Sequence, residues 1–149
     1  MSNSSLNNLF MPKRTVSSLK KKAWEAFSLY YRQSQADHSG LVICYTCKHA
    51  HHWKSIQSGH AIGGRHGGVL FDEEIIRPQC YSCNVGRRGN YQVFITNLIN
   101  ENGLDWWNKK LESSRQVKKW VRSELEELIQ TYQAKLSVLE RTKKWSNHA

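Results

Sequence analysis

The sequence lacks any apolar run long enough to cross a membrane. Its first dozen residues are polar and lack the apolar core of a secretory signal peptide. These two absences predict a protein of the cytoplasm, where thiols stay reduced. Acidic residues are also scarce, because 12 Asp and Glu stand against 22 Lys and Arg and give a formal charge of +10. Nucleic acid is the commonest partner of so basic a small chain, although a merely soluble basic surface has the same composition.

The chain has 149 residues, enough for one domain with a modest core and helical extensions. We expect residues 1–13 to form a disordered tail. Residues 14–112 are predicted to form an N-terminal helix and the main core, and residues 113–149 a long basic helix and tail. The excess positive charge is concentrated towards the two ends. That distribution is expected if the ends hold phosphates and the centre holds polar chemistry.

The pattern of apolar residues predicts a mainly helical α+β protein. Helical periodicity of apolar side chains is found over residues 15–36, 91–102, 104–111 and 115–141. Residues 41–43 read as a short strand, and residues 58–62 and 69–71 are expected to pair as a hairpin across a glycine-rich loop. The last helix carries a narrow apolar row that suits packing on the N-terminal helix or on a second copy of the chain. A homodimer through this helix is therefore one prediction.

Two C-x-x-C pairs predict a structural zinc site. They are Cys44-Tyr-Thr-Cys47 and Cys80-Tyr-Ser-Cys83, and together they use all four cysteines of the chain. Each pair can form a knuckle that offers two thiolates, and two knuckles complete a tetrahedral site for Zn²⁺. Redox chemistry at either pair is one alternative. Replacement of one cysteine ligand by His49, His51 or His52 is another. Residues 48–79 separate the knuckles, a longer gap than zinc ribbons have, and this gap contains a Gly-His segment.

Candidate catalytic residues lie between and just after the knuckles. Hydrolysis of a phosphodiester needs an activated water and a cation on the developing charge. His60 is the candidate general base, and its alternative is an ordinary loop histidine. Asn84 follows Cys83 directly and offers an amide oxygen to Mg²⁺ or Mn²⁺, although Asn is also a common helix N-cap. Asn90 is a second candidate metal ligand or DNA contact.

Basic residues around these positions are candidate DNA ligands. A guanidinium group suits bidentate contact with phosphate, and a solvated surface charge is the alternative for each residue. The candidates for DNA binding are Lys54, Arg65, Arg87 and Arg88.

The chain resembles the NinG family of phage recombination proteins, the lambda-type family also called Rap. The resemblance covers roughly residues 15–140 and rests on an ordered set of motifs. These are Lys21-Lys-Ala-Trp24, Ala36-Asp37, Cys44-Tyr-Thr-Cys47, Trp53-Lys54, Gly59-His60, Phe71-Asp72-Glu73, Pro78-Gln79-Cys80, Cys83-Asn84 and Gly89-Asn90. More distantly, the two knuckles with the histidine and the asparagine are similar to the phage junction-resolving endonuclease VII.

This resemblance implies an HNH endonuclease, with a zinc-stapled ββα-metal core flanked by the N-terminal helix and the long C-terminal helix. It implies a phage or prophage protein that cuts Holliday junctions, D-loops and related branched DNA in a bacterial host. Two positions depart from the HNH pattern. Gly59 stands where many HNH enzymes have an acidic metal ligand, and Ile75 stands where an asparagine usually braces the histidine loop.

Two other classes of function remain open from the sequence. One is a zinc-stabilised DNA-binding recombination accessory protein without catalysis, which the missing acid and asparagine favour. The other is an interaction protein assembled through the helix at residues 115–141, which leaves the Gly-His segment unexplained.

Overall fold

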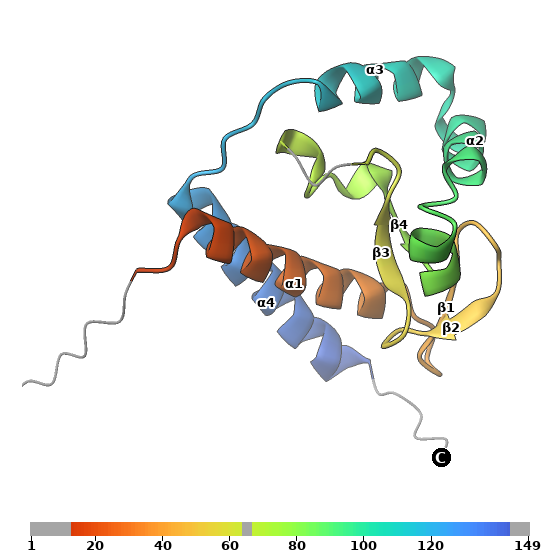
Figure 1. The fold of residues 1–149 in the computed structure, drawn as a ribbon. Coiled ribbons are helices and arrows are strands. Elements are labelled where there is room, and N and C mark those ends of the chain that lie inside the picture. The colour runs from red at the N-terminus through yellow and green to blue at the C-terminus, as the bar shows by residue number, and fades with distance from the viewer. Residues whose placement is uncertain (1–12, 64–66, 144–149) are drawn as a thin grey trace, which may run out of the picture.

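The computed structural model describes residues 13–63 and 67–143. The chain is a mixed α+β protein in which helices predominate, as Figure 1 shows. The helices are α1 (Val16–Ser34), α2 (Tyr91–Asn102), α3 (Leu104–Ser114) and α4 (Arg122–Thr142). The strands are β1 (Leu41–Ile43), β2 (Ala50–His52), β3 (Gln57–His60) and β4 (Ile76–Gln79), and three single helical turns are η1 (Gly67–Val69), η2 (Glu73–Ile75) and η3 (Ser82–Gly86). The predicted tails at residues 1–12 and 144–149 lie outside the described residues.

Helices α1 and α4 lie side by side and run in the same direction (Figure 1). At one end Arg122 donates to the carbonyl of Arg14, and at the other Lys143 donates to the carbonyl of Gln33 at 2.9 Å. The two helices bury a shared apolar seam between them, made of Leu19, Ala23, Phe27, Leu125, Ile129 and Tyr132. Of the two arrangements open from the sequence for the last helix, packing on the N-terminal helix is therefore the one present within the chain.

The start of α4 differs from the prediction of a helix over residues 115–141. Residues 116–121 are not helical, and α4 begins at Arg122. The Glu124 carboxylate accepts from the Val121 backbone N–H at 3.2 Å and pairs with Lys118 at 2.7 Å. The Trp120 indole donates to the carbonyl of Gly67 at 3.1 Å. The Glu124 contacts cap the start of α4, and the Trp120 contact ties the preceding segment to η1. A non-helical backbone therefore replaces the first two helical turns expected from periodicity.

The hairpin predicted between residues 58–62 and 69–71 is wrong. β3 pairs antiparallel with β4, with Gln57 opposite Gln79 and His60 opposite Ile76. Val69 lies in the turn η1, where its side chain is buried in the core. The residues at 69–71 are therefore apolar because turn residues there are buried in the core, and not because they form a strand. The second sheet of the fold pairs β1 with β2, and the sequence predicted only the first of these two strands.

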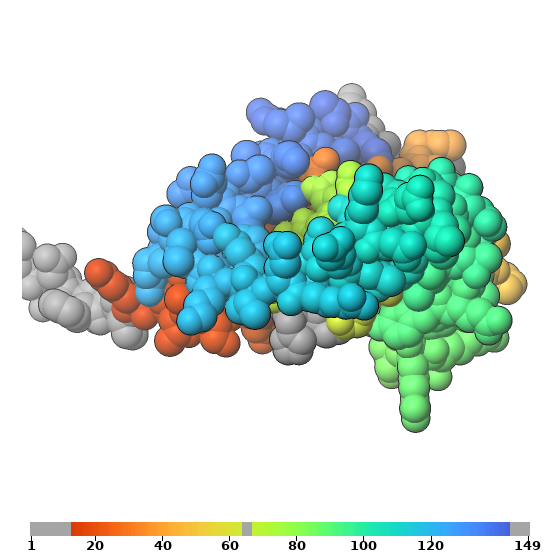
Figure 2. Space-filling view, turned by 90° about the horizontal axis from the view of Figure 1, so that it is seen from above, coloured from red at the N-terminus to blue at the C-terminus, as the bar shows by residue number. Residues whose placement is uncertain are grey.

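Helices α2 and α3 form the outer face of the molecule opposite the α1–α4 pair. Figure 2 shows them (teal) covering one side together with the segment that leads into α4 (light blue). Phe94 and Leu98 from α2 and Trp107 from α3 are buried against Ala61, Val69 and Ile75. This cluster therefore holds the residue after β3, the turn η1 and the turn η2 against α2 and α3. None of the described helices is long and apolar enough to span a bilayer.

Candidate metal centre and candidate active site

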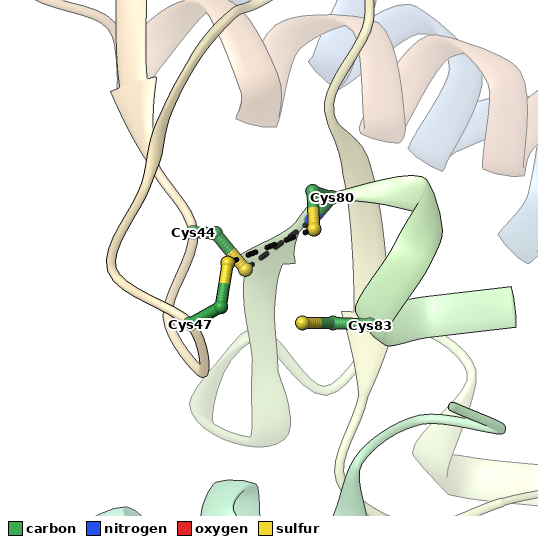
Figure 3. A group of neighbouring side chains, drawn as sticks. All are labelled: Cys44, Cys47, Cys80 and Cys83. Atoms are coloured by element: carbon green, nitrogen blue, oxygen red, sulfur yellow. Dashed lines mark hydrogen bonds between the residues drawn. The ribbon is translucent and has the colours of Figure 1, made fainter. Parts of the chain in front are cut away.

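The four cysteines converge on one point in the fold. Cys44 and Cys47 belong to the turn that joins β1 to β2, while Cys80 follows β4 and Cys83 lies in η3 (Figure 3). All four sulfur atoms lie within 4.8 Å of one another. A tetrahedral Zn²⁺ ion with Zn–S bonds of about 2.3 Å requires sulfur atoms about 3.8 Å apart, and the Cys47 and Cys80 sulfurs are 3.8 Å apart. The donor set and its spacing therefore fit structural zinc.

Hydrogen bonds prepare this cluster for a cation. Burial raises the pKa of the Cys44 thiol, but the backbone N–H groups of Cys47 and Cys80 and the Thr46 hydroxyl outweigh it and bring the pKa to about 6. Burial and the neighbouring thiols raise the pKa of Cys80 to about 12. One thiolate is thus favoured, and ionisation of Cys80 is opposed by burial and by the neighbouring thiols. A divalent cation that binds all four sulfurs removes this opposition.

The cysteine cluster contains no histidine ligand. The group of potential metal ligands gathered among the described residues consists of the four cysteines alone, and all four are free thiols. His49, His51 and His52, considered as alternative ligands, are not part of it. His52 instead accepts from the Lys54 backbone N–H through Nδ1 at 3.2 Å. The convergence of both C-x-x-C pairs on one closed site favours zinc binding over a separate redox pair.

His60 ends β3 and is held from two sides. Its Nε2 lies 3.0 Å from the carbonyl oxygen of Leu70. Its ring stacks on the Trp24 indole of α1, with centroids 4.8 Å apart and planes at 28°. The side chain is half-buried. The backbone N–H of the next residue, Ala61, donates to the carbonyl of Ile75 at 2.9 Å. His60 thus has a restricted orientation at the edge of the hairpin.

The two departures from the HNH pattern have structural counterparts. A Cβ atom at Gly59 would lie 2.1 Å from Oε1 of Gln79, so the buried Gln79 side chain occupies the space of a side chain at position 59. Ile75 is fully buried in the core. Its backbone carbonyl holds Ala61, so main chain at position 75 contacts the residue beside His60. Position 59 is therefore limited by the packing of Gln79, and position 75 belongs to the apolar core.

Asn84 lies in η3, one residue after the zinc knuckle. Its backbone N–H donates to the carbonyl of Cys80 at 2.9 Å, and its Nδ2 donates to Oε1 of Gln57 at 2.8 Å. The first contact ties Asn84 to the knuckle and the second ties it to β3. Because the amide nitrogen is used in this way, the amide oxygen is the remaining acceptor of the side chain.

A polar cleft of about 400 Å³ opens beside Asn84. It is formed by α1, the segment from Lys54 to Ser58, and η3. The residues that line it are Trp24, Ser28, Arg32, Lys54, Ser55, Ile56, Gln57, Ser58, Asn84 and Val85. Trp24 belongs to this lining and also stacks on His60, so the cleft adjoins the candidate base.

The remaining predicted residues lie in different places. Lys54 lines the cleft, whereas Arg87 and Arg88 are exposed in the turn after η3. Asn90 precedes α2, and its Nδ2 lies 3.8 Å from the Cys83 sulfur. Asn90 is therefore placed at the cysteine cluster and does not line the cleft with Asn84. Arg65 lies outside the described residues.

Sequence reasoning missed the contribution of α1 to the cleft. Trp24, Ser28 and Arg32 recur at a spacing of four residues and so share one helical face. This stripe of Trp, Ser and Arg beside the buried apolar face was the signal in the sequence for a second contact surface on α1. The stripe lines a cleft only because β3 and η3 lie across from it, and helical periodicity does not predict that packing.

Comparison with known proteins gives one family. The family model described as "Bacteriophage Lambda NinG protein" matches residues 11–143, most of the chain. Neither the curated proteins nor the solved structures contain a match.

Proposed function

The chain belongs to the family of the bacteriophage lambda NinG protein, and from that premise we propose that it is a metal-dependent endonuclease that cuts branched DNA. The proposed substrates are recombination intermediates such as Holliday junctions and D-loops, in the cytoplasm of a bacterial host. The excess of 22 basic over 12 acidic residues suits such a polyanion.

The proposal places the chain in the HNH superfamily. Its support is the order of elements around the candidate site. An antiparallel hairpin of β3 and β4 carries His60 on its first strand, and η3 with Asn84 follows the second strand after the cysteine knuckle. A histidine and an amide oxygen are thereby presented from adjacent segments on a rigid, cysteine-anchored support.

The hydrogen bond of His60 is the observation that carries the proposal. A backbone carbonyl only accepts, so the contact between Nε2 and the Leu70 oxygen requires a proton on Nε2. In a neutral imidazole the basic lone pair then belongs to Nδ1. The stack on Trp24 limits rotation of the ring. In the proposed mechanism Nδ1 takes a proton from the water that attacks the phosphorus.

Asn84 is the proposed ligand of a catalytic Mg²⁺ or Mn²⁺ ion. Its amide oxygen is a hard donor of the kind these ions prefer, and its bonds to Cys80 and Gln57 restrict its position. When bound, the ion supplies charge stabilisation at the phosphate and at the departing 3′ oxygen. A single neutral ligand binds weakly, so the site needs oxygens from the DNA itself.

A non-catalytic DNA-binding module is the second candidate function. The observation in its favour is the chemistry of the cleft, because no carboxylate is among the residues that line it in the described part of the chain. Such a module would bind branched DNA through the same basic groups and would leave the strands intact.

A cleavage assay separates the two candidates. The purified zinc-loaded protein is incubated with a labelled four-way junction and with a linear duplex of the same sequence, in Mg²⁺, in Mn²⁺ and without added divalent ion. We expect metal-dependent cutting of the junction. His60→Ala is expected to lower the rate by roughly 10²- to 10⁴-fold, the usual contribution of a general base. His38→Ala, at an exposed position in the turn before β1, is the matched control.

The two functions give opposite results. Tight junction binding without cutting in either metal would contradict the nuclease and support the binding module. Cutting by His60→Ala at the rate of the parent protein would exclude His60 as the base. Circular dichroism and zinc content of each variant show whether a lost rate reflects chemistry or folding.

A further inference from the structure

The cleft beside Asn84 carries positive charge without a compensating acid. Arg32 comes from α1 and Lys54 from the segment before β3. Neither forms an ion pair with a carboxylate within residues 13–63 and 67–143. Arg32 is half-buried and hydrogen-bonds to backbone carbonyls, whereas Lys54 is exposed. A partly buried cation is further stabilised when an anion joins it. The charge of the cleft therefore points to an anionic ligand.

Arg32 is held in place by the protein backbone. Its Nε donates to the carbonyl of Ser28 at 3.2 Å, and its Nη1 donates to the carbonyls of Trp53 at 3.1 Å and Ile56 at 3.5 Å. None of these bonds uses Nη2. Burial lowers the pKa of the guanidinium, which still stays charged near neutral pH. The side chain is therefore ordered before a ligand arrives, so little conformational entropy is lost on binding.

The neutral polar groups of the cleft bond to protein instead. The Ser28 and Ser58 hydroxyls are 3.0 Å apart, Asn84 donates to Gln57, and the Ser55 hydroxyl donates to the carbonyl of His52. These bonds use part of the hydrogen-bonding capacity of the neutral groups and fix their orientation, while the amide oxygen of Asn84 remains an acceptor. The two cations can still donate to a ligand. None of the Arg32 bonds named above uses Nη2, and Lys54 is exposed with its ammonium over the Trp53 ring. The two cations of the cleft thus suit phosphate groups, which carry no base identity.

We propose that this cleft binds the sugar-phosphate backbone of one DNA strand, with Arg32 as its principal phosphate ligand and Lys54 as the second. The inference rests on the proposed function and assigns a substrate-binding role to α1. Trp24 lines the cleft and stacks on His60, and Ser58 and His60 share one face of β3. A strand bound at Arg32 therefore runs beside the candidate base, and recognition through the two phosphate contacts is independent of sequence.

The test measures binding without cleavage. The zinc-loaded full chain is titrated with a fluorescent single-stranded oligonucleotide of mixed sequence, over a series of salt concentrations and without Mg²⁺ or Mn²⁺. Each phosphate contact contributes about 0.7 to the slope of log K against log salt for a single strand. Arg32→Gln and Lys54→Gln are each expected to reduce that slope by about 0.7 and to weaken binding roughly ten-fold. Lys109→Gln, an exposed change of the same charge on α3, is the control and should bind like the parent.

The outcomes decide the proposal separately from the nuclease. Unchanged salt slopes for Arg32→Gln and Lys54→Gln would overturn the proposed binding site. An equal loss of affinity in Lys109→Gln would also overturn it, because binding would then depend only on the net charge of the protein. If Arg32→Gln fails to fold, Lys54→Gln decides, because Lys54 is exposed and makes no buried contact through its ammonium. A parent protein that binds through Arg32 and Lys54 but never cuts would refute the proposed nuclease and leave this site standing.

Discussion

At the scale of single residues, the sequence identifies Gly59 as an unusual position, and the contact with Gln79 explains why a glycine is there. The sequence marks it as the place of a missing acid. The structure fills that space with Gln79, a fully buried side chain whose Nε2 donates to Thr46 and to the carbonyl of Gly89. Its Oε1 has no hydrogen-bond partner among the described residues. Gln79, whose strand β4 pairs with β3, thereby joins the first cysteine knuckle and the turn after η3 to the hairpin that carries His60.

Gly59→Ala is expected to destabilise the protein by about 1–3 kcal/mol, because the new methyl group displaces Gln79 and breaks its two hydrogen bonds. Chemical denaturation measures the free energy of unfolding. When Gln79→Ala is already present, Gly59→Ala should lower the free energy of unfolding by less, because the methyl group no longer collides with the Gln79 side chain. Gly68→Ala is the control, because nothing lies within 4 Å of its added Cβ. Equal costs for Gly59→Ala with and without Gln79 would contradict this account.

At the scale of elements, α4 supports the end of α1 as well as its side. The Lys143 ammonium donates to the carbonyls of Gln33 and Ser34 at the end of α1 and to that of Ala36 two residues later. Carbonyls in the last turn of a helix lack the usual i+4 donor. A cation at this end of a helix is also favoured by the helix dipole. The contact therefore fixes the point where α1 passes into the β1–β2 unit and the first cysteine knuckle.

Lys143→Met keeps most of the side-chain stem and removes its donors. We expect a loss of about 1–3 kcal/mol in the free energy of unfolding, the range for hydrogen bonds to a charged group. Thermal and denaturant unfolding provide the measurement. Lys119→Met removes an exposed charge elsewhere and serves as the control. A Lys143→Met variant as stable as Lys119→Met would show that the contacts to α1 contribute nothing.

The helices were more predictable than the strands at this scale. Periodicity placed α1, α2 and α3 within a few residues, because each helix buries one regular apolar face. β2 and β4 were missed, since strands of three or four residues contain too few alternations to be recognised. The start of α4 was placed too early because the bond from Trp120 to the distant Gly67, together with the cap that Glu124 forms with Val121 and Lys118, overrides local helical preference.

At the scale of the whole molecule, the cysteine cluster joins the two small sheets. The first knuckle belongs to the β1–β2 sheet and the second follows β4 of the other sheet. Cys44, Cys80 and Cys83 form a core cluster with Val42 and Ile56. Two-stranded sheets are marginal by themselves. Zinc binding is therefore expected to stabilise the fold and to hold Asn84 next to β3.

Cys83→Ser is expected to lose the bound zinc, to lower the melting temperature and to abolish DNA cleavage together. Elemental analysis should find about one zinc per chain in the parent protein, as four thiolates complete one tetrahedral site. Ser82→Ala, an exposed change in the same turn, is the control and should keep its zinc. A zinc-free parent, or a Cys83→Ser variant with unchanged melting temperature, would contradict the structural role of the metal.

The sequence by itself determined the features that depend on local pattern and composition. These are the basic charge, three of the helices, the grouping of the four cysteines as one set of potential metal ligands, and the family. Tertiary structure alone decided the pairing of β3 with β4, the contact between the His60 ring and the Leu70 carbonyl, and the place of one face of α1 in the cleft. Each of these depends on contacts between segments far apart in the chain. Such contacts are selected by packing of the whole core, which local patterns do not specify.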